Sequence, residues 1–291
     1  MEGFLCIDKP LGPSSFAVTA TVKRALQLKK VGHCGTLDPY ASGLLVLTLE
    51  ESTKLLQYLP SDPKVYVFGL KFGYTTDTLD LQGKETGRND IIPQESALFS
   101  SLPHFTGTIL QTPPLFSAIK YKGKRAYKLA REGEDITLPP REVEIFSLEV
   151  LNYDRENGEA LIKTSCSGGT YVRSLARDIA QSLGTIGVVS QLRRIQSGDF
   201  TIKNAIKLES IQDAQNYIIP TRRVFSDHAV TINNDHKSKL LFGKDIVLPE
   251  FESKKRDRLF AFDEGMGLVS VLKRVEGERF HPEKVFTKAC R

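Results

Sequence analysis

The sequence predicts an α+β or mixed-sheet protein with a small β-rich module at its C-terminal end. Three observations support this. Strand-like and helix-like segments are mixed without the regular rhythm of βαβ units. From about residue 226, short strand-like runs separated by Asp, Asn and Gly replace the mixed pattern. The chain has 291 residues, more than the roughly 50 to 200 of a typical domain. We therefore expect one domain at 1–225 and a second at 226–291.

Hydrophobic periodicity predicts the elements of the first part in order. FLCID at 4–8 is typical of a short strand. A helix is expected to open near Ser15, because apolar residues then recur at helical spacing. Two further strands are predicted by the apolar run 44–49 and by the alternating segment KVYVFGLKF at 64–72. Strands are also expected at 143–151 and 160–166, and a helix at 171–183.

Composition excludes several classes of protein. A hydrophobic share of 40% with 26% charged residues is ordinary for a soluble globular protein. No apolar stretch approaches the roughly 20 residues of a membrane span, and the N-terminus lacks the basic and apolar regions of a secretory signal. The four cysteines are scattered and form no CxxC pair. We therefore expect a cytoplasmic protein without disulfides or a zinc ribbon.

The stretch GHCGTLDPYASGLLVL at 32–47 places one carboxylate, Asp38, between turn-forming residues and an apolar run. By itself, the pattern favours a turn before a buried strand. His33, Cys34 and Asp38 have irregular spacing and no evident fourth ligand, so no metal site is expected. Asp77 and Asp80 could supply a second carboxylate for acid–base chemistry, but a polar turn is the favoured interpretation for both.

A basic run lies between residues 120 and 131, KYKGKRAYKLAR, with two tyrosines and no acid. Such a run is either a solvated helix face or a surface that neutralises phosphates and stacks on bases. Its basic side chains are Lys120, Lys122, Lys124, Arg125, Lys128 and Arg131.

These motifs resemble those of the TruB family of tRNA pseudouridine synthases, whose signature runs GHxGTLDPxAxGxL. Further matches follow in the family's order, covering residues 3–200 nearly continuously. They are DKPLGPSSF at 8–16, KVYVFGLKFGYTTDTLDLQG at 64–83, QTPPLFSAIKYKGKRAYKLAREG at 111–133, CSGGTYVRSLARDIA at 166–180 and, more weakly, QLRRIQSGDF at 191–200.

The resemblance implies a pseudouridine synthase fold, in which helices flank a mixed, mainly antiparallel sheet, followed by a PUA-like RNA-binding domain. It implies isomerisation of uridine 55 in the TΨC arm of tRNA, without cofactor or metal, and with Asp38 as the essential residue. Two alternatives stay open, a tRNA-binding and folding module and a synthase acting on another RNA. We expect a monomer that needs no protein partner and no membrane.

The resemblance also assigns site residues. Arg173 matches the arginine that pairs with the aspartate, and Tyr66 matches the active-site tyrosine. His33 matches a histidine associated with base extrusion, while Tyr171 and Leu192 match positions at the pocket. Without the resemblance, these residues would be interpreted as surface, sheet, turn and core residues. The basic run falls in an RNA-contacting insertion at about 111–137.

Two features limit the assignment. Where the family usually has a small residue, histidine and leucine before LRR, this chain has Gly187, Val188 and Val189, so the function of that histidine is absent. Lys9 and Lys64 match motif lysines, but the sequence does not separate a structural role from RNA contact for either one.

Overall fold

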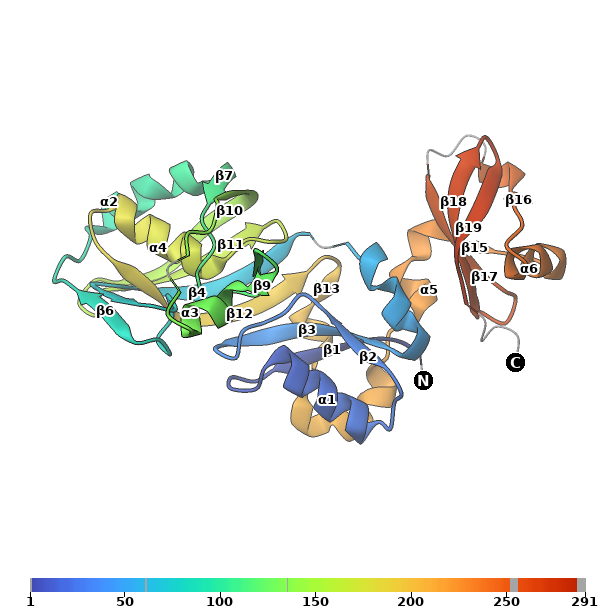
Figure 1. Cartoon of the computed structure of the whole chain (residues 1–291), viewed down its shortest axis with the longest axis horizontal. Coiled ribbons are helices and arrows are strands. Elements are labelled where there is room, and N and C mark those ends of the chain that lie inside the picture. Colours follow the sequence, from blue (N-terminus) through green and yellow to red (C-terminus); the bar gives the residue numbers. More distant parts are fainter. Residues whose placement is uncertain (1, 61, 135, 252–255, 287–291) are drawn as a thin grey trace.

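A ten-stranded mixed sheet forms the larger part of the computed structural model, which describes residues 2–60, 62–134, 136–251 and 256–286 (Figure 1). Eight strands follow the order β14-β1-β3-β12-β4-β11-β10-β7, with β2 paired to β3 and β13 to β12. Only the β1–β14 and β3–β12 pairs in this sheet are parallel. Its strands are β1 (Gly3–Lys9), β2 (Val31–Cys34), β3 (Ala41–Leu49), β4 (Lys64–Phe72), β7 (Gly107–Gln111), β10 (Arg141–Asp154), β11 (Glu159–Cys166), β12 (Gly187–Ser197), β13 (Phe200–Thr201) and β14 (Ile206–Lys207).

Two helices pack on one face of this sheet. Helix α1 (Ser15–Ala25) begins at Ser14, whose hydroxyl accepts a hydrogen bond from the Ala17 backbone at 3.1 Å. Its Val18 and the Ile179 side chain of α4 (Val172–Ser182) are fully buried in the same apolar cluster. The expected helices and strands of the first part are thereby confirmed, as is the mixed, mainly antiparallel sheet. The other helices are α2 (Glu95–Ser101), α3 (Ala126–Arg131), α5 (Thr221–Val224) and α6 (Asn234–Leu241).

Smaller elements connect these layers. Two hairpins form small sheets of their own, β5 (Tyr74–Thr76) with β6 (Glu85–Arg88), and β8 (Lys120–Tyr121) with β9 (Lys124–Arg125). Short 3-10 helices complete the chain: η1 (Glu50–Tyr58), η2 (Leu102–Phe105), η3 (Ile202–Asn204), η4 (Leu208–Tyr217), η5 (Ser226–His228) and η6 (Pro249–Phe251). No helix in the described ranges is both long enough and apolar enough to span a bilayer.

The C-terminal part forms its own five-stranded sheet, in the order β15-β17-β18-β19-β16. The sheet lies in a separate lobe of the molecule (Figure 1). Its strands are β15 (Ala229–Thr231), β16 (Ile246–Val247), β17 (Arg258–Phe262), β18 (Leu268–Glu276) and β19 (Arg279–Val285). The β-rich module expected from the sequence is thus confirmed, while its boundary at residue 226 stays a prediction.

An apolar cluster joins the two sheets. Side chains alternate along β1, so Leu5 and Ile7 face the helices while Phe4 and Cys6 face the opposite side. On that side they share a buried cluster with Phe260 of β17. Phe225 stacks on Phe260 with ring centroids 3.8 Å apart. Both faces of β1 and β3 are therefore buried, which explains why the run 44–49 is apolar without alternation.

Gly43 is required by the close approach of β3 and β12. Its φ is +96°, and a Cβ atom added there would lie 2.2 Å from the Arg194 carbonyl oxygen. Gly107 has a similar φ of +89° but open space around it.

We expect Gly43→Ala to lower the free energy of unfolding by more than Gly107→Ala does, measured by urea denaturation. Both variants carry backbone strain of about 1–3 kcal/mol. Only Gly43→Ala adds a steric clash, which costs about 1–3 kcal/mol more. Equal losses would show that β3 and β12 can separate without cost.

Candidate active site

Asp38 lies in a loop between β2 and β3 that is fixed by backbone contacts. The Ser15 hydroxyl of α1 donates to the Leu37 carbonyl at 2.9 Å and accepts from the Leu37 N–H at 2.8 Å. The Gly12 N–H donates to the Pro39 carbonyl at 2.9 Å, and the Tyr40 hydroxyl donates to the Ser190 carbonyl. The loop is therefore held on both sides of Asp38, so its carboxylate is presented in a defined position.

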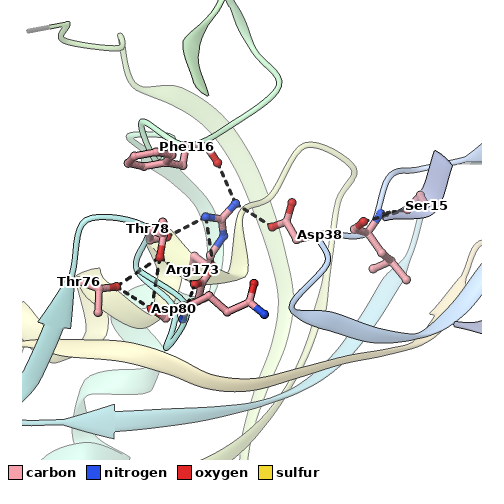
Figure 2. A network of polar contacts seen from close by, with 9 residues as sticks. Ser15, Asp38, Thr76, Thr78, Asp80, Phe116 and Arg173 are labelled. Carbon is pink, nitrogen blue, oxygen red and sulfur yellow. Dashed lines mark hydrogen bonds and ion pairs between the residues drawn. The ribbon is translucent and has the colours of Figure 1, made fainter. Parts of the chain in front are cut away.

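Arg173 faces this carboxylate from α4 (Figure 2). Its Nη2 lies 2.7 Å from Asp38 Oδ2, while Nη1 lies 3.6 Å from Asp80 Oδ2. The same guanidinium donates to the carbonyls of Thr78 and Phe116, at 2.7 and 3.1 Å. The Arg173 side chain is 7% exposed and that of Asp38 43%. The guanidinium is thus buried among its acceptors, and Asp38 alone faces the open side.

Asp80 is part of the site, so the interpretation of Asp80 as a residue of a polar turn only is incomplete. Its side chain is 7% exposed and accepts hydrogen bonds from the Thr78 hydroxyl at 2.8 Å and the Gln82 N–H at 3.1 Å. The Thr76 hydroxyl donates a hydrogen bond to the Asp80 carbonyl at 2.7 Å (Figure 2). Among the described residues, the Asp77 carboxylate, by contrast, accepts a hydrogen bond only from the Lys84 N–H, as expected of a turn residue.

A cavity of about 270 Å³ opens beside this ion pair. Five of the residues that the family resemblance assigns to the site line it, although they come from distant segments. The five are Asp38, Tyr66, Tyr171, Arg173 and Leu192. Lys64 and Ser117 also line the cavity. Carboxylate, guanidinium, phenol and apolar surface therefore meet at one opening, as expected for a site that binds a small planar group.

Tyr66 is a buried phenol whose charged form is disfavoured. Burial raises the pKa of Tyr66, and the nearby charge of Arg194 acts in the opposite direction. Cys166 and Asp38 also face it and raise its pKa. The phenol therefore keeps its proton at neutral pH.

His33 lies next to the cavity but does not line it. Its Nδ1 is 3.5 Å from the Thr19 hydroxyl, and its Nε2 is 3.3 Å from the hydroxyl of Thr36, which does line the cavity. Burial, and after it the charge of Arg194, lower the pKa of His33, so the imidazole is neutral at physiological pH.

The basic run forms an exposed hairpin and helix rather than part of the cavity wall. All six basic side chains are exposed. Arg125 donates to the carbonyl of Ala118, which lines the cavity. Lys124 lies 4.0 and 3.8 Å from the carboxylates of Glu132 and Glu134, just beyond the run. The run therefore borders the cavity. Residue 135 of the expected insertion lies outside the described residues.

No group of three or more His, Cys, Asp or Glu side chains within the described ranges could hold a metal ion. Cys6, Cys34 and Cys166 are free thiols, and Cys290 lies outside the described residues.

The sequence did not indicate the roles that three residues have at the site. Ser15 fixes the Asp38 loop, Asp80 is the second carboxylate at Arg173, and Arg194 is fully buried behind the cavity. Each lies inside a motif, but only the fold shows what its side chain contacts.

Comparisons with protein families and curated proteins identify similar chains. Residues 23–172 match the family model of the N-terminal domain of TruB family pseudouridylate synthases, and residues 173–224 match that of the tRNA pseudouridylate synthase B C-terminal domain. The tRNA pseudouridine synthase B of Ehrlichia chaffeensis is 41% identical over 78% of this chain and 79% of its own length. That of Aquifex aeolicus is 38% identical over 92% of this chain and 95% of its own length.

Solved structures show the same fold. A chain of a Cbf5-Nop10-Gar1 complex superposes with a TM-score of 0.73 and 26% identity, covering 97% of this chain and 84% of that chain. A chain of an H/ACA RNP bound to a substrate RNA containing 2′-deoxyuridine superposes with a TM-score of 0.72 and 25% identity, covering 98% and 84%.

Removal of Arg173 is expected to destabilise the protein chiefly through Asp80. Arg173→Met leaves the buried Asp80 carboxylate without its cation, which should cost about 3–5 kcal/mol of unfolding free energy. Adding Asp80→Asn should restore about 1 kcal/mol or more. Adding Asp38→Asn should restore less, because that carboxylate is half-exposed. Urea denaturation of the single and double variants measures both effects. Strict additivity of Arg173→Met and Asp80→Asn would contradict the pairing.

Proposed function

Because this chain belongs to the TruB family of pseudouridylate synthases and is a tRNA pseudouridine synthase, we propose that it isomerises uridine 55 in the TΨC arm of tRNA with Asp38 as the essential group. The observation that carries the proposal is the pairing of the half-exposed Asp38 with the buried Arg173 at the mouth of the cavity. The reaction breaks the bond between ribose C1′ and uracil N1, joins C1′ to C5, and moves a proton from C5 to the base nitrogen.

One carboxylate suffices for this reaction. No water is added and no group leaves, so the paired acid and base of a hydrolase are not needed. The carboxylate must stay charged in a site that a bound nucleotide desolvates, and Arg173 stabilises that charge. Asp38 then acts on the ribose, either by attack on C1′ or by removal of the C2′ proton.

Tyr66 supplies a face for the extruded uracil. A base must leave its stack before an enzyme reaches its sugar, and an aromatic ring in the cavity compensates for the lost stacking. The Tyr66 hydroxyl takes part in the late loss of the C5 proton. Because the phenol is neutral, it passes its own proton on as it receives that one. Leu192 and Tyr171 complete the wall around the base, and His33 braces the RNA at the gap that the base leaves.

RNA outside the cavity is held by the exposed basic run next to it. Its six positive side chains contact phosphates, and Tyr121 and Tyr127 lie beneath cations of the same run. The C-terminal sheet is a PUA-like RNA-binding domain beginning at residue 226.

We also propose that the protein works as a cytoplasmic monomer without an obligatory protein partner. In support of this, a single chain supplies Asp38, Tyr66 and Arg173 to one cavity. An isomerisation moves no net electrons, so it needs no redox cofactor.

Asp38→Asn should abolish activity while leaving the fold intact. We expect release of tritium from C5-labelled uridine in a tRNA transcript to fall by at least about 10³-fold, as for loss of a group that acts on the reacting atoms. Asp77→Asn is the matched control, because the Asp77 carboxylate accepts a hydrogen bond within its own turn and does not line the cavity. Full activity of Asp38→Asn would refute the mechanism.

Tyr66→Phe should separate stacking from proton removal. The ring remains, so binding of a stem-loop should change little, whereas the rate of tritium release should fall by about 10²-fold or more. Tyr66→Leu should weaken both. A Tyr66→Phe enzyme with normal tritium release would assign proton removal to another group.

Charge reversal in the basic run should weaken tRNA binding. For Lys122→Glu with Lys124→Glu, the slope of log Kd against log salt should decrease by about 0.7–0.9 for each phosphate that the protein no longer neutralises. Lys163→Glu is the control. Lys163 pairs with Val67, so its side chain lies on the opposite face of the sheet from Tyr66. An unchanged Kd for the double variant would show that the basic run does not contact the RNA.

A further inference from the structure

Lys64 brings a second cation into the cavity. It lies two residues before Tyr66 on β4, so both side chains point to the same face of the sheet, and both line the cavity. Among the residues that the structure describes, none forms a salt bridge or hydrogen bond with its ammonium group. Burial, and after it the charge of Arg194, lower the pKa of Lys64, while Cys34, Cys166 and Asp62 oppose this.

Arg194 stands behind the same wall. It is fully buried, and its Nε and Nη2 donate to the carbonyls of Leu44 and Gly35 at 2.8 and 2.9 Å. Its Nη1 has no hydrogen-bond partner among the described residues. A Cβ atom added to Gly35 would lie 3.2 Å from Arg194 Nη1 and 3.4 Å from Lys64 Nζ. The two cations therefore converge on one point of the wall.

The cavity wall thus carries two groups of charges with opposite net sign. Around Asp38, one guanidinium is paired with two carboxylates. Around Lys64, two cations adjoin, and the one carboxylate that raises the pKa of Lys64, that of Asp62, accepts the Gly168 N–H. Partly buried charges are stable only when they are compensated, so the group around Lys64 needs a further anion. Uracil and ribose are neutral, and the phosphate is the one anionic group of a nucleotide.

We propose that Lys64 binds a backbone phosphate next to the target uridine. The inference rests on the proposed function. Both Arg194 and Asp38 act on the pKa of Tyr66, so the ring is close to both groups of charges. A phosphate held at Lys64 then leaves the base over the ring and directs the ribose toward Asp38.

Lys9, the other motif lysine, has a different role. It is fully buried, and its ammonium donates to the carbonyls of Pro10 and Pro13 at 2.9 and 2.8 Å. Lys9 therefore fixes the turn before α1, and it has no open face for RNA. The structure separates the two lysines that the sequence left undecided.

The test measures binding of a TΨC stem-loop as a function of salt. Lys64→Gln should raise the Kd by about tenfold and reduce the slope of log Kd against log salt by about 0.7–0.9, the contribution of one phosphate. Lys64→Arg, which keeps the charge, should stay within about threefold of the unaltered protein. Lys71→Gln is the matched control on the same strand, because the Lys71 ammonium donates to the Asn157 carbonyl. Thermal melting of each variant verifies that the fold is intact.

Neutral methylphosphonates placed in turn on the 5′ and 3′ sides of the target uridine identify the phosphate. One of them should weaken binding to the unaltered protein as much as Lys64→Gln does, and should have no further effect on Lys64→Gln. An unchanged Kd and salt slope for Lys64→Gln would overturn the proposal, as would additive losses at both positions.

Tritium release by the unaltered protein from the unmodified stem-loop is measured in parallel. Its absence would refute the proposed function itself. Normal tritium release, together with an unchanged Kd and salt slope for Lys64→Gln, would refute only the phosphate contact.

Discussion

Burial of the Arg173 guanidinium is the constraint from which the rest of the site follows. A cation that is almost fully removed from water needs acceptors on every side, and here they are Asp38, Asp80, Thr78 and Phe116. These four come from the β2–β3 loop, the β5–β6 hairpin and the segment after β7, while the arginine comes from α4. The segments must therefore converge before the charge is compensated, which couples formation of the cavity to formation of the fold.

Sequence patterns predicted the elements well because a buried face requires apolar residues at the spacing of the helix or strand. Val18 and Val22 mark the buried face of α1, and the run 44–49, apolar except for Thr48, marks a strand buried on both sides. The same patterns carry no record of which polar side chains meet. Asp80 looked like a turn residue, because its partner Arg173 lies far away in the sequence. The short pairs of β13 and β14 also left no signal, since two residues are too few for a period to be seen.

Family motifs and side-chain contacts carry different information about the site. The resemblance selects Asp38, Tyr66, Arg173, Tyr171 and Leu192, and the fold brings all five to one cavity. The contacts in the structure show how neighbouring side chains affect these residues. Arg194 affects the pKa of both Tyr66 and His33 while holding the carbonyl of Gly35. A buried cation with one unpaired nitrogen therefore acts on several groups of the site without touching the opening.

The apolar cluster between the two sheets packs them against each other. The Phe4 ring contacts Phe225, which stacks on Phe260, so aromatic contacts set the spacing of the two sheets. An RNA bound to both sheets, as in the proposed function, would therefore have to match a spacing that this packing sets, without contact to any base outside the cavity.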